Sequence, residues 1–161
     1  SGTHVLWGKN DLVEIAKELS EIYPDTCYIV SFGNYAKKDE PVEKPADNIF
    51  VYQYADYDTF LPKVDYIIHH GGTGILYNGI KFNKPSVIIP HDYDQFDYAV
   101  RAEIAEIGFP ASLKSRKSVI DAVGKMLNKK EWKKLEKMSE DFKKYNPSDV
   151  LKKEIERLVK K

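Results

Sequence analysis

The stretch that decides the fold spans residues 65–95 and is DYIIHHGGTGILYNGIKFNKPSVIIPHDYDQ. Its apolar run Tyr66 to Ile68 predicts a short buried strand, which breaks into the glycine-rich turn His70 to Gly74. From Ile75 the apolar residues fall at helical spacing, and Ser86 to Ile89 is a second β-branched run. We therefore predict a strand–turn–helix–strand unit whose helix presents unpaired N–H groups at the ligand-binding edge of a parallel sheet.

The turn from Gly71 to Gly74 favours an anion site. Glycines let the backbone approach a phosphate closely, and the helix dipole adds positive charge at that end. The pattern is neither the dinucleotide fingerprint nor a P-loop, so a tight turn without a ligand stays open as the alternative. His70 precedes the turn and could donate to a phosphate oxygen, whereas we expect His69 to be tucked under the sheet edge.

Further polar groups follow neighbouring strands. Asp94 and Gln95 offer several acceptors and two amide donors, which suits adjacent sugar hydroxyls, although either could instead cap the helix from Phe96. Tyr54 ends another strand, where its ring could stack on a flat base. One further set matches no common metal-ligand spacing: His69, His70, His91, Asp92 and Asp94. We therefore expect a ligand site of sugar and phosphate chemistry without a metal.

The rest of the chain alternates between strand and helix patterns. We predict strands at 26–32 and 48–53, a short strand or extended link at 109–113, and helices at 12–22, 96–107, 119–127, 132–145 and 149–159. Residues 36–47 are polar, contain two prolines and predict an exposed loop. This order implies an α/β, Rossmann-like parallel sheet with helices on both faces, followed by several helices.

Length and composition are typical of one small soluble domain. The 161 residues fit a single domain, and 25 basic against 25 acidic residues suggest no nucleic-acid or anionic-membrane partner. Cys27 lies alone in an apolar run, which predicts a buried thiol and a reducing compartment. We find no apolar stretch of the ~20 residues that a membrane helix needs, and no signal-peptide pattern. We predict a cytoplasmic protein.

The run His70 to Gly74, followed by Asp94-Gln95, resembles the C-terminal donor-binding half of UDP-sugar-dependent glycosyltransferases of the GT-B fold. That family glycosylates lipids and natural products, and the likeness runs from about Ser1 to Leu113. The resemblance implies diphosphate binding by His70, Gly72, Thr73, Gly74 and Thr3, hexose binding by Asp94 and Gln95, and base and ribose binding by Tyr54, Ala55 and Asn78.

The resemblance leaves open where the first strand lies and which donor binds. Ser1-Gly2-Thr3 is similar to the family's turn after the first strand of this half, whereas Val5-Leu6-Trp7 is an alternative first strand. Asn78 stands where plant members have a ribose-binding glutamate, and Tyr57 replaces a glutamine, so the donor is not fixed. The family's catalytic base and acceptor site lie in its N-terminal half, so we expect no catalytic residue in this chain.

The resemblance therefore implies one donor-binding domain, residues 1–161, of an inverting glycosyltransferase whose N-terminal acceptor domain is absent. We expect it to bind a UDP-sugar as substrate, to use neither cofactor nor metal, and to be inactive alone. A lipid or small-molecule acceptor would come through the missing domain or a partner subunit. The alternatives are a naturally separate donor subunit of a two-chain N-acetylglucosaminyltransferase, a non-catalytic nucleotide-sugar-binding module, and an epimerase-like domain with only His70, His91 and Asp94 for acid–base work.

Overall fold

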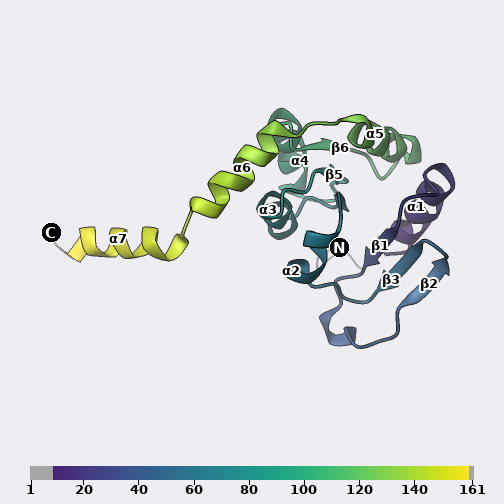
Figure 1. Cartoon of the computed structure of the whole chain (residues 1–161), viewed down its shortest axis with the longest axis horizontal. Helices are drawn as coiled ribbons and strands as arrows, with labels where there is room; N and C mark the ends of the chain where they lie inside the picture. Colours follow the sequence, from purple (N-terminus) through teal and green to yellow (C-terminus); the bar gives the residue numbers. More distant parts are fainter. Residues whose placement is uncertain (1–8, 160–161) are drawn as a thin grey trace.

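The computed structural model describes residues 9–159, with the side chains from residue 11 onward, and shows strands and helices alternating along the chain (Figure 1). The elements are α1 (Lys9–Ile22), β1 (Tyr28–Ser31), η1 (Tyr35–Lys37), β2 (Glu43–Ala46), β3 (Ile49–Tyr52), α2 (Tyr57–Phe60), η2 (Leu61–Lys63), β4 (Ile67–His69), α3 (Thr73–Lys81), β5 (Ser86–Ile88), α4 (Gln95–Ile104), β6 (Gly108–Pro110), α5 (Arg116–Asn128), α6 (Lys133–Lys144) and α7 (Pro147–Val159). The predicted α/β class is confirmed.

The described strands form two three-stranded sheets, in the orders β1-β3-β2 and β4-β5-β6. Every pair is parallel except β2 with β3, which is antiparallel. Strand β2 lies in the segment that the sequence predicted to be a loop. The prediction was wrong because it took Pro45 as a sign of a loop. Proline lacks an N–H, but it is tolerated on an edge strand. Strand β2 is an edge strand, and its register is irregular between Glu43 and Ala46.

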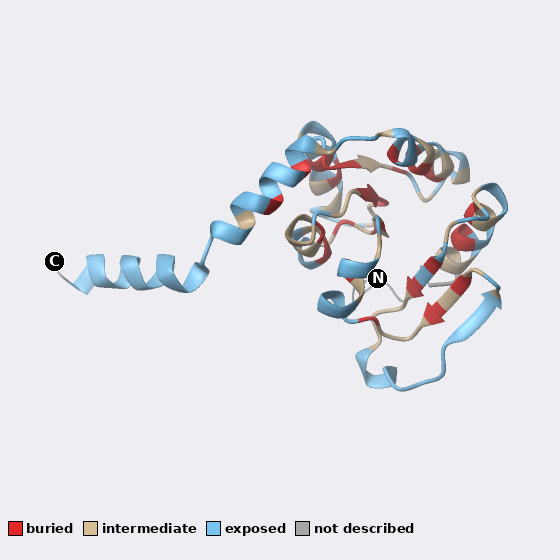
Figure 2. Cartoon of the chain, in the orientation of Figure 1, coloured by how far each residue is buried: buried red, intermediate tan, exposed pale blue. Residues whose placement is uncertain are grey.

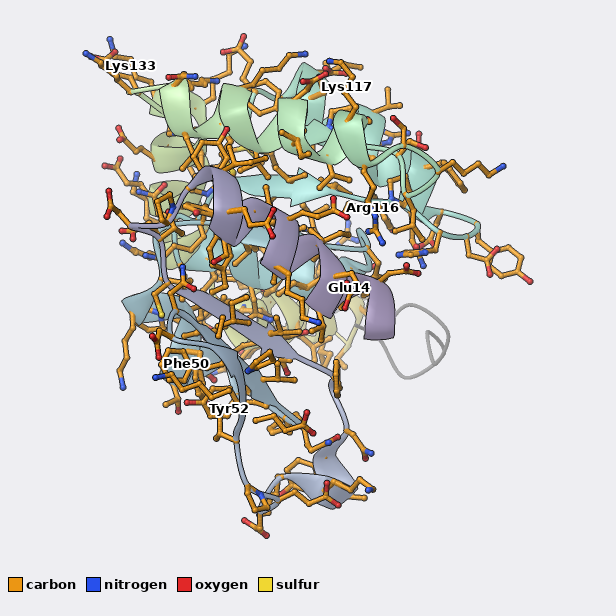
Figure 3. All side chains as sticks on the ribbon, turned by 90° about the vertical axis from the view of Figure 1, so that its right-hand side faces the viewer. Glu14, Phe50, Tyr52, Arg116, Lys117 and Lys133 are labelled. Atoms are coloured by element: carbon orange, nitrogen blue, oxygen red, sulfur yellow. The ribbon has the colours of Figure 1, made fainter. Side chains whose placement is uncertain are left out.

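Helices cover both faces of the β4-β5-β6 sheet. Val87 and Ile89 join the large core under α1 and α5, whereas Ile88 packs with α4 and with Leu135 of α6 on the opposite face. This alternation is what the two-residue period of a strand produces when both faces are buried. Figure 3 shows α1 and α5 side by side with Arg116 between them; its guanidinium pairs with Asp11 of α1 at 3.1 Å.

Cys27 is exposed, so the prediction of a buried thiol was wrong. The reason is the strand period: Tyr28 and Val30 of β1 are buried, whereas Ile29 between them is 39% exposed. Cys27 precedes β1 by one residue and therefore shares the uncovered side with Ile29.

Helices α6 and α7 differ in how they pack against the rest of the domain. Helix α6 is anchored by buried Leu135, by Ser139, whose hydroxyl donates to Lys81 O at 3.2 Å, and by Phe142, whose ring lies 4.4 Å from that of Tyr77. Helix α7 instead extends away from the body, and all its described side chains are exposed (Figure 2). None of the described helices combines the length and apolarity needed to cross a membrane.

Candidate functional site

A glycine turn joins β4 to α3, as the sequence predicted. Gly71 has a positive φ of +91°, and a Cβ there would lie 2.9 Å from Ile88 Cγ2, so only glycine fits without strain. Gly72 is the N-cap of α3, and no described side chain caps this helix. Apart from its chain neighbours and the backbone of its own helix, no heavy atom of the described residues would lie within 4 Å of a Cβ on Gly74. The first N–H groups of α3 therefore offer the donors and the partial positive charge that an anion needs.

His70 lies beside this helix end. Its Nε2 is so close to Gly72 that a Cβ on that residue would overlap the ring. Its Nδ1 is buried and finds no hydrogen-bond partner in the described part of the chain. Burial lowers the pKa of His70 to about 4, with the nearby Asp94 carboxylate acting in the opposite direction. The imidazole is therefore neutral near pH 7 and can donate one hydrogen to an anion at the start of α3.

His69 has a structural position. Its side chain is only 8% exposed, as expected, and its Nδ1 accepts a hydrogen bond from Gly71 N at 3.0 Å. Burial lowers the pKa of His69 to about 3, so the ring is neutral and carries its hydrogen on Nε2. That Nε2 is buried and has no partner among the described residues.

Asp94 and Gln95 follow β5 and begin α4. Asp94 is the N-cap residue and is exposed, and its side chain makes no capping hydrogen bond. The Gln95 Oε1 accepts from His91 N at 2.9 Å and from Asp92 N at 3.2 Å. The amide of Gln95 thus holds the loop before α4 with its oxygen, and only its NH₂ remains to meet a ligand.

Tyr54 and Ala55 follow β3. The rings of Tyr54 and Tyr35 form a T-shaped pair with centroids 5.0 Å apart. This contact fixes the orientation of the Tyr54 ring. Ala55 is buried, and its N–H donates to Ser31 Oγ at 3.0 Å. Its carbonyl is therefore the backbone group of Ala55 that a base could meet without displacing Ser31.

Helix α3 carries two more of the predicted residues. Asn78 is half-buried, and its Nδ2 donates to Gly74 O at 2.8 Å, which leaves its Oδ1 as an acceptor. Thr73 is exposed, and its hydroxyl donates to the Tyr98 hydroxyl of α4 at 3.4 Å. Sequence reasoning missed Tyr98 at this helix end, because its place depends on how α4 packs against α3. Thr3 lies outside the described residues.

One cavity of about 1170 Å³ brings part of this set together. Tyr54, Ala55, His70 and His91 line it. Asp94 stays outside its lining but is near enough to affect His70 electrostatically. Within the described ranges, no group of three or more His, Cys, Asp or Glu side chains could hold a metal ion. The site can thus hold a flat ring beyond the end of β3 and an anion at the start of α3.

Comparison with protein families gives a match over nearly the whole chain. Residues 9–155 match the model described as the glycosyltransferase family 28 C-terminal domain. A similar curated protein is UDP-glucosyltransferase A1 of Starmerella bombicola, 28% identical over 98% of this chain and 35% of the relative. Sterol 3-beta-glucosyltransferase of Saccharomyces cerevisiae (strain YJM789) is 33% identical over 56% of this chain and 8% of the relative.

Solved structures share the fold. The glycotransferase of kitacinnamycin superposes with a TM-score of 0.81 at 20% identity, over 98% of this chain and 41% of that one. The spinosyn rhamnosyltransferase SpnG, complexed with thymidine diphosphate, gives a TM-score of 0.78 at 18% identity, over 96% of this chain and 43% of that one. The chain therefore spans well under half the length of these proteins.

Proposed function

The chain belongs to the glycosyltransferase family 28 C-terminal domain family, and from this premise we propose that it is the donor-binding domain of an inverting, UDP-sugar-dependent glycosyltransferase. The observation that carries the proposal is the uncapped start of α3 beside the neutral ring of His70. A diphosphate needs several N–H donors in a small volume, and this end of the helix supplies them. The curated relative named for UDP-glucose supports the choice of donor.

Each part of the donor has its own residues in this proposal. The diphosphate binds His70, Gly72, Thr73 and Gly74, together with Thr3; the hexose binds Asp94 and Gln95; the base and ribose bind Tyr54, Ala55 and Asn78. The hexose would receive the free NH₂ of Gln95, since its oxygen already holds the loop. The base would meet the carbonyl of Ala55, since its N–H is bound to Ser31.

In the reaction, an acceptor hydroxyl attacks the anomeric carbon and forms the new C–O bond while the bond to the UDP oxygen breaks. The hydroxyl proton goes to a base outside this chain, and the negative charge develops on the leaving diphosphate. His70 and the N–H groups at the start of α3 would stabilise that charge more strongly in the transition state than in the bound donor. The chain itself would bind and orient the donor, with no catalytic base, cofactor or metal of its own.

This proposal makes the chain a single domain that transfers no sugar alone. The acceptor, a lipid or a small molecule, would be presented by another domain or subunit. A cytoplasmic location remains a prediction. The relatives' greater length is consistent with a second half that carries the acceptor site.

Calorimetric titration tests the donor site. We expect UDP and UDP-glucose to bind the wild-type domain, and His70→Ala to weaken both by about tenfold, because a charge-assisted hydrogen bond contributes about 1.5 kcal/mol or more. UDP-N-acetylglucosamine and thymidine diphosphate, titrated in parallel, report which sugar and base the site prefers.

Lys137→Ala serves as the control, because Lys137 is exposed on α6, far in sequence from the β4–α3 turn. Its affinities should equal those of the wild type. Absence of binding by every one of these ligands at millimolar concentration would overturn the donor-domain proposal. Equal affinity of His70→Ala and wild type for UDP would instead remove only His70 from the diphosphate site.

A further inference from the structure

Two exposed aromatic residues bracket the pair that the proposed function assigns to the hexose. Tyr93 directly precedes Asp94 and is 87% exposed, and Phe96 directly follows Gln95 and is 55% exposed. Adjacent Cα atoms lie only about 3.8 Å apart, so both rings are attached within reach of a ligand at Asp94 and Gln95. Most phenylalanine and tyrosine side chains are largely buried in folded proteins, so two exposed rings at a candidate ligand site require a reason.

The backbone conformation of Tyr93 strengthens this point. Its φ is +43°, in the left-handed region that glycine and asparagine adopt readily and that a bulky residue adopts only at a cost in free energy. Because the ring is exposed, it buries too little surface in the fold to offset this cost. Strained residues concentrate at functional sites. The described fold therefore gives no structural reason for a tyrosine at position 93.

Hydrogen bonds hold the backbone of the loop that carries Tyr93. Gln95 Oε1 accepts from His91 N and Asp92 N. Asp92 accepts in turn from two neighbours, from Gln95 N at its backbone oxygen and from Tyr93 N at Oδ1, each at 3.1 Å. A ring presented by an ordered loop loses less conformational entropy on binding than a ring on a mobile one. The loop thus presents Tyr93 in a form that favours binding.

Apolar surface continues from Phe96 along α4. Val100 and Ile104 follow at intervals of four residues, the spacing that places side chains on one side of a helix, and they are 52% and 73% exposed. We call Phe96, Val100 and Ile104 the apolar stripe; Ala99 and Ala102 are buried on another side of α4. At a rise of 1.5 Å per residue, the stripe is about 12 Å long. It begins beside the hexose pair, so a molecule that meets the hexose is placed to cover it.

The charges beside the stripe favour an uncharged occupant. Asp97 and Arg101 lie on the same helix and pair with each other at 2.6 Å. Since each has an opposite charge as its partner, neither requires a charged group on a bound molecule. What the stripe offers is apolar surface, which gains free energy when another apolar surface covers it.

We propose that Tyr93 and the apolar stripe bind the acceptor, and that the acceptor carries its reactive hydroxyl on an uncharged, apolar body long enough to cover them. The inference rests on the proposed function, because a hexose held by Asp94 and Gln95 is what brings an acceptor to these residues. The acceptor hydroxyl must reach the anomeric carbon, so the acceptor body lies beside the hexose and extends over Tyr93 and α4. The domain then contributes an acceptor contact as well as the donor site.

Alkyl β-glucosides bound together with UDP mimic the product side of the reaction and test this proposal. A titration with UDP alone comes first and reports on the donor site. At saturating UDP, NMR chemical-shift titrations then compare methyl β-glucoside with octyl β-glucoside, the latter below the concentration at which it forms micelles. We expect octyl glucoside to bind at least about tenfold more tightly, because its chain buries apolar surface, and its additional shifts to fall on Tyr93 and α4.

Two variants locate the source of that gain. Tyr93→Asn removes the ring, and because asparagine tolerates a φ of +43°, the thermal midpoint should stay the same or rise. Phe96→Ala removes the first ring of the stripe. Each variant should weaken octyl glucoside binding by about threefold to tenfold and leave the affinities for methyl glucoside and UDP unchanged. Leu158→Ala is the matched control, since Leu158 is 64% exposed on α7, and it should change none of these affinities.

Three results would overturn the proposal while UDP still binds. The first is that octyl glucoside binds no more tightly than methyl glucoside, or that neither binds. The second is a gain for octyl glucoside that both variants keep, which would mean adventitious apolar binding elsewhere. The third is a lower thermal midpoint of Tyr93→Asn with unchanged octyl glucoside affinity, which would make the ring structural. Absence of UDP binding would instead remove the proposed function, and this inference with it.

Discussion

At the scale of single residues, the side chain of Gln95 holds a loop with its oxygen, and the proposed function assigns its NH₂ to the ligand. Its Oε1 accepts hydrogen bonds from His91 N and Asp92 N, while its NH₂ is the group that would meet the sugar in the proposed function. We expect Gln95→Ala to lose about tenfold in UDP-glucose affinity, as one hydrogen bond is worth about 1 kcal/mol, while UDP affinity is kept. Calorimetry with both ligands measures the difference.

Gln95→Glu is the matched control for that experiment. Its carboxylate can still accept from His91 N and Asp92 N, but it lacks the NH₂ donor. If sugar contact is the role of Gln95, both variants lose UDP-glucose affinity. If only Gln95→Ala loses UDP-glucose affinity, Gln95 acts by holding the loop before α4. A parallel loss of UDP affinity would show that Gln95 does not act on the hexose.

Because His69 is buried, we predict that the free energy of unfolding falls at acid pH. Burial lowers its folded pKa to about 3, below the ordinary value of 6.5, so the unfolded chain binds the proton more readily. This contribution to stability is complete above pH 6.5 and falls as the pH drops toward 3, by at most about 1.4 kcal/mol per pH unit. Urea unfolding of wild type and His69→Asn at pH 7.5, 6 and 5 should show a flatter dependence in the variant.

Asparagine is chosen because its Oδ1 can replace Nδ1 as the acceptor for Gly71 N, which keeps the turn bonded. Carboxylates that protonate at low pH act in both proteins alike. Parallel pH profiles of the two proteins would therefore contradict a buried neutral His69.

At the scale of secondary structure elements, α7 contrasts with α6. Helix α7 buries no side chain, whereas α6 buries Leu135 and Ser139. We expect a chain that ends at Asn146 to keep its thermal midpoint within about 2 °C and to bind UDP as the full chain does, because folding stability comes mainly from apolar burial. Differential scanning calorimetry and titration check both. A further truncation before Lys133 is the control and should destabilise strongly.

A large fall in the midpoint on removing α7 alone would mean that this helix packs against something in solution. The apolar surface for such packing would come from its exposed residues Val150, Leu151, Ile155, Leu158 and Val159.

At the scale of the whole molecule, one core unites the two sheets. Ile49 and Val51 of β3 belong to the same buried cluster as Val87 and Ile89, through α1 and α5. The candidate site lies where both sheets end, so its halves depend on that shared core: Tyr54 and Ala55 follow one sheet, and His70 and Asp94 follow the other. A donor that spans the two sheets would therefore favour their association.

The sequence by itself determined the local units. Periodicity and glycine spacing placed β4, the turn and α3 correctly, because strand and helix patterns and turn chemistry are local properties. They also placed α1, α5 and α6 within a few residues. The roles of the predicted site residues stay predictions, since they depend on a bound ligand.

Only the tertiary structure decided the rest. It revealed β2, the exposure of Cys27 and the contact of Tyr98 with Thr73, each of which depends on which surfaces meet. It also showed that the oxygen of Gln95 and the N–H of Ala55 are already hydrogen-bonded. Long-range packing sets these features, and no local pattern of residues encodes which neighbour a strand or a side chain finds.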